Sequence, residues 1–268
     1  DYPGNNIKYW KVPGGKWRWV LYDTDFGFAG QWWSDWDQNY AYFYDTLDFV
    51  LSGNQTTWAN PPWATLFLRK LVDNIEFRNK FINRYADEMN TRYMPSNVTS
   101  HFIDIHDNMY NEMSNHIERW TESEPWVSQE SVYQYLDNMN NFAVNRPTEA
   151  KYHIINQFDL DSYHEVILYN ETPELGYIRL NNNLKIQEEE WIGDYFEDVP
   201  ITLKAIPESG YEFSHWSGDV DSTDSEIVIN ITDNSVIQAN FLNSSGINLV
   251  INEINYKSSD NFDTGDWV

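Results

Sequence analysis

The spacing of apolar and polar residues changes character twice along the chain. Residues 7–12 and 17–22 alternate with a period of two and are rich in aromatic residues, and the turn residues 13–15 lie between them, so this part predicts a β-hairpin. Over 61–158 apolar residues recur at spacings of three and four, which predicts helices. Over 166–242 the period of two returns. The pattern therefore predicts an α+β protein.

Turn and breaker residues divide the helical part further. Pro61-Pro62 is a plausible helix start, and Pro95-Ser96 marks a break before a helix over 98–120. A further helix is expected over 128–145, with Pro147 opening the last one. The preceding stretch, 30–60, is rich in Trp, Tyr and Asp and has no clear periodicity. We expect it to be a long ordered loop with short helical turns.

The last third reads as a small all-β domain over 166–242. Its strands are separated by clusters of Gly, Pro, Asn and Asp and are expected at 165–169, 176–180, 201–206, 227–231 and 236–241. Residues 243–246 have the composition of a linker, and a new strand pattern over 247–268 is left unfinished. Because the chain also begins at Asp1, without an initiator Met, we expect a piece of a longer protein.

Composition narrows the classes of function. Hydrophobic residues make up 41% of the 268 residues, enough for packed cores, and no stretch approaches the length of a membrane span. The net charge of −25 disfavours nucleic acid and anionic membrane surfaces as partners. It indicates a well-solvated surface, or attraction of divalent cations or basic protein substrates. There is no cysteine, so disulfides and thiolate metal sites are excluded.

Candidate chemistry gathers around the predicted hairpin. Phosphoryl transfer needs a carboxylate near the acceptor and oxygen ligands for a divalent metal, and protein kinases supply them from Asp-x-x-x-x-Asn followed by Asp-Phe-Gly. Asp1 and Asn6 have the first spacing, and Asp23-Thr24-Asp25-Phe26-Gly27 leaves the hairpin. If the strand alternation continues, Asp23 and Asp25 share a face and can share a cation. The alternative is that these are turn and strand-end residues.

A Trp- and Arg-rich strand runs into an Asp-x-Asp element over 14–27, and helical segments follow at 66–71, 76–78, 84–87, 116–120 and 142–147. In these segments, up to about residue 160, the chain resembles the CotH family, the spore-coat protein H kinases. The family implies the β-hairpin and helical C-lobe of an atypical protein-kinase-like fold. It also implies ATP-dependent phosphorylation of Ser or Thr on coat or secreted proteins.

Residue by residue, the resemblance implies that Asp1 is the catalytic carboxylate. Asn6 would be a ligand of Mg²⁺ or Mn²⁺, and either Asp23 or Asp25 would supply the metal-binding carboxylate beside ATP. The nucleotide-clamping lobe of such a kinase should precede Asp1. We therefore expect this segment alone not to turn over ATP, because half a clamp leaves little transition-state stabilisation.

Two further resemblances concern the β-region and the last residues of the chain. Segments 193–195, 201–205, 210–213, 215–218 and 238–241 are similar to internalin-type B-repeat modules. Segments 251–256 and 265–267 are similar to the first strands of a lamin-tail domain. Such modules imply spacing or adhesion without catalysis. Together the resemblances imply an exported bacterial protein, located outside the cell, on the cell surface or in the spore coat.

Competing interpretations remain at this stage. The fold could serve as a pseudokinase or coat scaffold, and the abundant Trp residues and carboxylates would also suit a carbohydrate-active protein. Trp32, Trp33 and Trp36 could line a substrate groove or pack the loop onto the helices. His116 is expected to be structural, and His101 and His106 are too poorly spaced to form a metal pair. The acidic run 219–224 is expected to be a solvated turn, since it lacks the full calcium-loop pattern.

Overall fold

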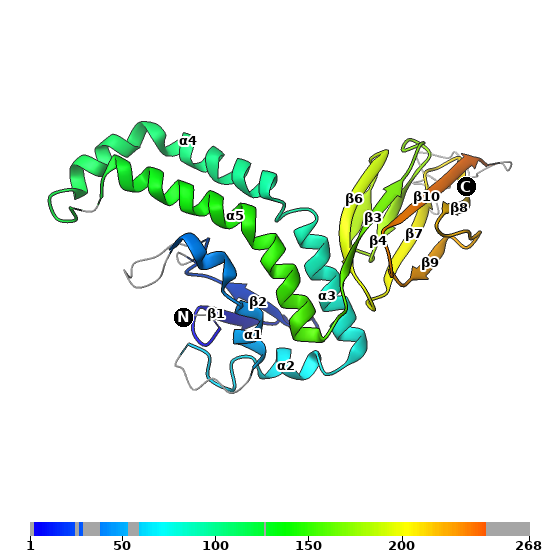
Figure 1. Ribbon diagram of the computed structural model, residues 1–268, viewed down its shortest axis with the longest axis horizontal. Coiled ribbons are helices and arrows are strands. Elements are labelled where there is room, and N and C mark those ends of the chain that lie inside the picture. The colour runs from blue at the N-terminus through cyan, green and yellow to red at the C-terminus, as the bar shows by residue number, and fades with distance from the viewer. Residues whose placement is uncertain (1–2, 25–26, 29–37, 53–58, 126, 245–268) are drawn as a thin grey trace, which may run out of the picture. The chain divides into compact units, whose positions relative to one another are not determined.

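The computed structural model describes residues 3–24, 27–28, 38–52, 59–125 and 127–244. By contact, the chain divides into two compact units. The first unit comprises 1–166, 192–201 and 228–235, and the second comprises 167–191, 202–227 and 236–268. All helices in the described part of the chain lie in the first unit, so the protein is α+β with the helical segment ahead of most strands (Figure 1).

The predicted hairpin is confirmed. Strand β1 (Ile7–Trp10) pairs antiparallel with β2 (Arg18–Leu21). The turn between them contains Gly14 at φ 74°, a left-handed conformation that glycine adopts without steric cost. Both strands are shorter than the apolar pattern predicted, and β2 ends two residues before Asp23.

Short helices follow the hairpin, as expected for the stretch before residue 60. A 3₁₀ helix η1 (Gln38–Phe43) precedes α1 (Thr46–Leu51), and α2 (Leu66–Leu71) leads into α3 (Ile75–Met89). The cap residues explain where two of them begin. The Asp45 carboxylate accepts hydrogen bonds from the first-turn N–H groups of α1, and the Asn74 side chain does the same for α3.

Two long antiparallel helices, α4 (Pro95–Trp120) and α5 (Gln129–Phe158), lie side by side (Figure 1). A capping box of Ser128 and Ser131 starts α5. The expectation that Pro147 opens a separate helix is wrong, because α5 continues through it. Pro147 has no N–H to donate and its ring crowds the carbonyl of Ala143, four positions earlier, yet the helix continues on both sides of it.

The β-region consists of two four-stranded sheets, ordered β6-β3-β10-β8 and β5-β4-β7-β9. Within the second unit the two sheets pack face to face, since a Cβ at Gly176 in β4 would lie 2.5 Å from the ring of Phe241 in β10. The sequence pattern predicted five of these strands and missed β5, β6 and β8. The strands are β3 (Tyr163–Tyr169), β4 (Gly176–Leu180), β5 (Leu184–Ile186), β6 (Glu190–Phe196), β7 (Ile201–Pro207), β8 (Tyr211–Gly218), β9 (Glu226–Ile229) and β10 (Ser235–Asn243).

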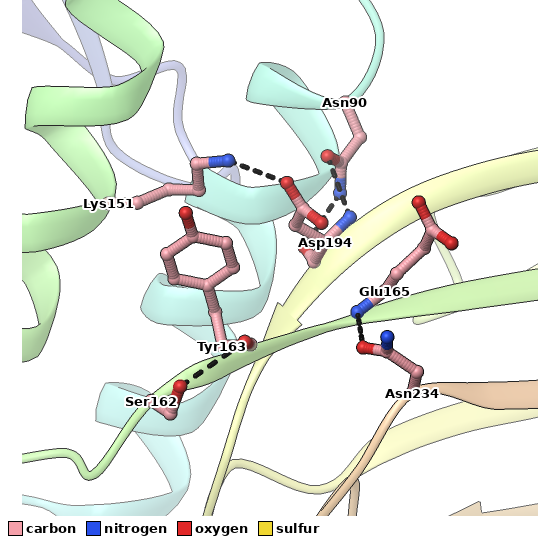
Figure 2. A network of polar contacts seen from close by, with 7 residues as sticks. All are labelled: Asn90, Lys151, Ser162, Tyr163, Glu165, Asp194 and Asn234. Carbon is pink, nitrogen blue, oxygen red and sulfur yellow. Dashed lines mark hydrogen bonds and ion pairs between the residues drawn. The ribbon is translucent and has the colours of Figure 1, made fainter.

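Part of β6 belongs to the helical unit, and partly buried polar contacts connect it to α3 and α5 (Figure 2). The Asn90 side chain exchanges two hydrogen bonds with the backbone of Asp194, at 2.9 and 3.0 Å. The Asp194 carboxylate lies 2.6 Å from Lys151 Nζ on α5. Tyr195 is fully buried, and its hydroxyl donates to Asp87 at 2.7 Å. Strand 192–196 thus completes the core beside α3 and α5.

None of the helices in the described part of the chain combines the length and the apolar character that crossing a lipid bilayer requires. The segments that resemble a lamin-tail domain, at 251–256 and 265–267, lie outside the described residues.

Candidate functional site

The base of the hairpin brings two of the predicted site residues together. Asn6 precedes β1 and is buried, with 5% of its surface exposed. Its Nδ2 donates to the main-chain oxygen of Asp23 at 3.1 Å, and its own carbonyl accepts from Tyr22 N at 3.2 Å. The hairpin therefore brings the side chain of Asn6 into contact with the main chain of Asp23.

Asp23 has an unusual backbone. Its φ of 57° is in the left-handed region, which aspartate tolerates better than most residues other than glycine. Since β2 has already ended, the strand alternation that would place Asp23 and Asp25 on one face does not extend to Asp23. The chain instead turns sharply here, and the Asp23 side chain is exposed. Asp159 and Asp198 adopt the same conformation elsewhere in the described chain, so it marks a tight turn at Asp23.

The other predicted site residues, Asp1 and Asp25, lie outside the described residues, as do Trp32, Trp33 and Trp36. In the described ranges no group of three or more His, Cys, Asp or Glu side chains gathers in a way that could hold a metal. The described part of the site therefore offers one amide oxygen and one carboxylate.

The hairpin differs in charge from the rest of the chain. Residues 3–22 contain four basic side chains and no acidic one, although the whole protein has a net charge of −25. Two of the cations lie over aromatic rings: Lys8 is 5.3 Å from the centroid of Tyr22, and Lys11 is 5.7 Å from that of Trp17. The hairpin is therefore a locally basic part of the chain, next to the acidic residue Asp23.

Both faces of the hairpin carry exposed aromatic and aliphatic side chains. Tyr9 and Trp19, which are opposite each other, are 63% and 57% exposed, and Trp10 on the other face is 47% exposed. A two-stranded hairpin without a covering layer is marginally stable in water.

The loop that carries Asn6 is tied to the helical body by one dipeptide. Ala59 O accepts from Gly4 N at 2.6 Å, and the next residue, Asn60, is 2% exposed and donates from Nδ2 to the main-chain oxygen of Phe49 in α1. The loop before β1 is thereby attached to α1 as well as to its own hairpin.

Helix α5 holds the start of α1 through Arg146. The guanidinium donates to the carbonyls of Tyr42 and Tyr44, both at 2.7 Å, and to Thr46 Oγ1 at 3.0 Å. The Phe142 ring, one turn earlier on α5, makes an edge contact with Phe28, which directly follows Gly27. Contacts from α5 therefore reach both the residues just after the Asp23–Gly27 element and the residues that lead into α1.

A buried histidine lies beside this cluster. His153 is 8% exposed, and its Nδ1 has no hydrogen-bond partner and lies 3.8 Å from Asp45 Oδ1. Burial lowers the pKa of His153; Asp45 opposes that effect and Arg146 adds to it. The neutral imidazole of His153 is therefore the favoured form at neutral pH. Burial also favours the neutral form of Tyr85, whose hydroxyl interacts with Arg146, and so raises the pKa of that tyrosine.

Asp219 and Asp224, from the acidic run 219–224, have structural roles, and His106 on α4 contacts residues of its own helix. Asp219 is tied into β-structure, with its carboxylate accepting from Val236 N at 2.7 Å, as a turn residue would be. The main-chain oxygen of Asp224 accepts a hydrogen bond from the indole N–H of the buried Trp216. His106 interacts with its neighbour Asp107 at 3.1 Å.

Sequence reasoning missed Asn60 and Arg146. No local pattern marks them, because each acts on main-chain atoms well away in sequence, up to 104 residues in the case of Arg146. Arg146 does fall within the segment 142–147 that carries the family resemblance. For Asn60 the sequence offered one signal, its position directly before Pro61-Pro62.

Comparison with known proteins gives two family matches. The family model for CotH kinase protein matches residues 1–150. The model for the divergent InlB B-repeat domain matches residues 192–245. No curated protein and no solved structure matches the chain significantly.

Proposed function

Because the chain belongs to the CotH kinase protein family, we propose that it forms part of a protein kinase that transfers the γ-phosphate of ATP to Ser or Thr hydroxyls. The observation that carries the proposal is the junction at the hairpin base, where the Asn6 side chain is bonded to the backbone of Asp23. An amide oxygen and a carboxylate at the two ends of one hairpin are the arrangement that kinases use to bind the metal–phosphate group.

The donor set fits magnesium or manganese. Both ions prefer carboxylate and amide oxygens, and Mg²⁺ usually takes only one or two protein carboxylates while substrate phosphates and water fill the other positions. When bound, the ion would neutralise charge on the transferring phosphoryl group. Asn6 and Asp23 would hold it, and Asp25 would contribute the second carboxylate if the turn after Asp23 brings it to the same side.

The basic hairpin supports the same assignment. Phosphoryl transfer depends on positioning and electrostatic stabilisation, so cations near the phosphates lower the barrier. Lys8 is exposed on β1, two residues after Asn6, and its Nζ lies 5.3 Å from the ring centroid of Tyr22, the neighbour of Asp23. The family resemblance assigns Asp1 the role of orienting the acceptor hydroxyl and accepting its proton.

For the acceptor, we propose coat or surface proteins. The support is the pairing of a CotH match with a B-repeat match on one chain, at 1–150 and 192–245. B-repeats are modules of bacterial surface proteins, so the pairing favours a location on the cell surface or in the spore coat. A basic acceptor would also complement a protein with a net charge of −25.

The test is phosphate transfer from γ-labelled ATP by protein expressed from the complete reading frame, with Mg²⁺ or Mn²⁺ and with chelator. Wild type is compared with Asp23→Asn, Asp25→Asn and the exposed-site control Asp73→Asn on the α2–α3 turn. We expect metal-dependent transfer that falls by two or more orders of magnitude in at least one hairpin variant and is unchanged in the control. Metal-dependent ATP binding without transfer would instead indicate a scaffold. Transfer that survives both hairpin substitutions would refute the proposal.

A further inference from the structure

Asn60 is one of the least exposed polar residues in the described ranges, at 2%. A buried amide that bonds to a main-chain carbonyl is costly to remove, because the carbonyl is left without its donor. The bond from Asn60 to Phe49 O and the bond from Gly4 N to Ala59 O are made by consecutive residues. The dipeptide 59–60 therefore connects α1 to the loop that precedes β1.

That loop has little other freedom. Pro3 and Asn6 are buried, and Asn6 is bonded at both its side chain and its carbonyl to residues 22–23. Because one residue separates Gly4 from Asn6, a shift of the Gly4 end of the loop would strain the bonds that hold Asn6 to residues 22–23. The bond at Gly4 therefore adds to the contacts that fix the position of Asn6.

The other end of the connection is rigid. Helix α1 buries Leu47 and Val50, and the residues leading into it are held by the three hydrogen bonds from Arg146 on α5. A guanidinium that makes several bonds in a fixed plane is a stiff attachment point. Helix α1 is therefore a fixed reference against which Asn60 can position the loop.

We propose that Asn60 is a positioning residue for the proposed metal site at the hairpin base. Through Ala59 and Gly4 it fixes the position of Asn6 relative to Asp23. The inference rests on the proposed function of that edge. It assigns to a residue outside the hairpin a role in metal affinity, exerted without any contact with the metal or the nucleotide. Residues that orient metal ligands typically change affinity by about 10–100-fold when they are removed.

The experiment compares Asn60→Ala with Asn83→Ala in the full chain. Asn83 is a matched control, because it is also buried, lies in the same unit and donates from Nδ2 to a main-chain carbonyl, that of Pro200 at 2.8 Å. Circular dichroism checks that each variant folds. If Asn60→Ala does not fold, Asn60→Ser replaces it, since a hydroxyl at that position can still bond to nearby polar groups.

The first readout is amide hydrogen exchange at Gly4 and Tyr22, whose N–H groups report the two bonds of the loop. We expect exchange at least about tenfold faster in Asn60→Ala than in wild type, and no change at these two amides in Asn83→Ala. Equal exchange in the two variants would overturn the inference, whatever the metal does.

The second readout is Mn²⁺ affinity in the presence of ATP, measured by electron paramagnetic resonance. We expect the dissociation constant to rise about tenfold in Asn60→Ala and to stay at the wild-type value in Asn83→Ala. If Asp23→Ala abolishes binding while Asn60→Ala leaves it unchanged, the inference is wrong and the proposed function stands. If wild type binds no Mn²⁺, the proposed function and the metal role of Asn60 are both wrong.

Discussion

Replacing Tyr195 by Phe should destabilise the helical unit without disturbing its packing. The tyrosine ring is fully buried and its hydroxyl donates to Asp87, itself 1% exposed, at 2.7 Å. Phenylalanine keeps the buried ring and removes the hydroxyl with its bond to Asp87. A hydrogen bond to a carboxylate is worth about 1.5–3 kcal/mol, and Asp87 loses a donor that water cannot replace at such burial.

The unit of 1–166, 192–201 and 228–235 is large enough that this loss corresponds to a fall in melting temperature of roughly 3–12 °C. Circular dichroism at 222 nm follows it selectively, because the described helices all lie in this unit. The control is Tyr133→Phe on α5 of the same unit, which removes the hydroxyl of a side chain that is 47% exposed and should change stability by less than about 0.5 kcal/mol. If the two variants melt within error of each other, the argument from burial is wrong.

The same tyrosine gives a pH test with a defined sign. Burial, then the charge of Asp87 and the hydrogen bond to it, raise the pKa of Tyr195 well above 10.0. A folded-state pKa above the unfolded value means that the contribution is complete below pH 10 and is lost as pH rises from 10 toward the folded value. Wild type should therefore lose stability above pH 10 more steeply than Tyr195→Phe. Parallel alkaline profiles for the two proteins would contradict this.

Three further predictions concern other parts of the chain. Because burial lowers the pKa of His153, wild type should lose stability as pH falls below about 6.5, and His153→Gln should lose less. Urea titrations between about pH 5 and 8 would measure the difference. Equal profiles for the two proteins would argue against a neutral buried imidazole. Gly218→Ala should cost at least about 2 kcal/mol in denaturant melts, since φ is 101° and the new Cβ would lie 2.3 Å from Val236 O, whereas Gly210→Ala, also left-handed but in open space, should cost about 1 kcal/mol. Asp23→Asn should leave the melting temperature within about 2 °C, since asparagine also tolerates the left-handed backbone, so a large drop would mean that the carboxylate is structural.

Several features followed from the amino-acid sequence alone, because they depend on neighbours a few residues apart. A period of two around Pro13-Gly14-Gly15 predicted the hairpin, and spacings of three and four predicted the helices. The residue types at the hairpin ends, Asn6 and Asp23, predicted a candidate site at the hairpin base, and in the structure these two residues are in contact. Hairpin pairing brings these residues, 17 apart in sequence, close to each other.

Where local rules and packing disagree, tertiary structure decided the outcome. Pro147 predicts a helix boundary, yet α5 continues, because α5 packs against α4, η1 and α1. Strand β6 escaped the alternation pattern because Tyr195 and Phe196 are both buried, so apolar and polar positions do not alternate there.

The positioning contacts were beyond sequence reasoning altogether. Asp87 reaches Tyr195 across 108 residues, Arg146 reaches Tyr42 across 104, and Asn60 bonds to a carbonyl, an atom that every residue carries. A hydrogen bond to the main chain leaves no mark in the identity of its partner. Periodicity and residue type therefore determined which elements form and which residues are available for chemistry. Only the packed fold determined that the buried amide of Asn60 lies where it can position Asn6 relative to Asp23.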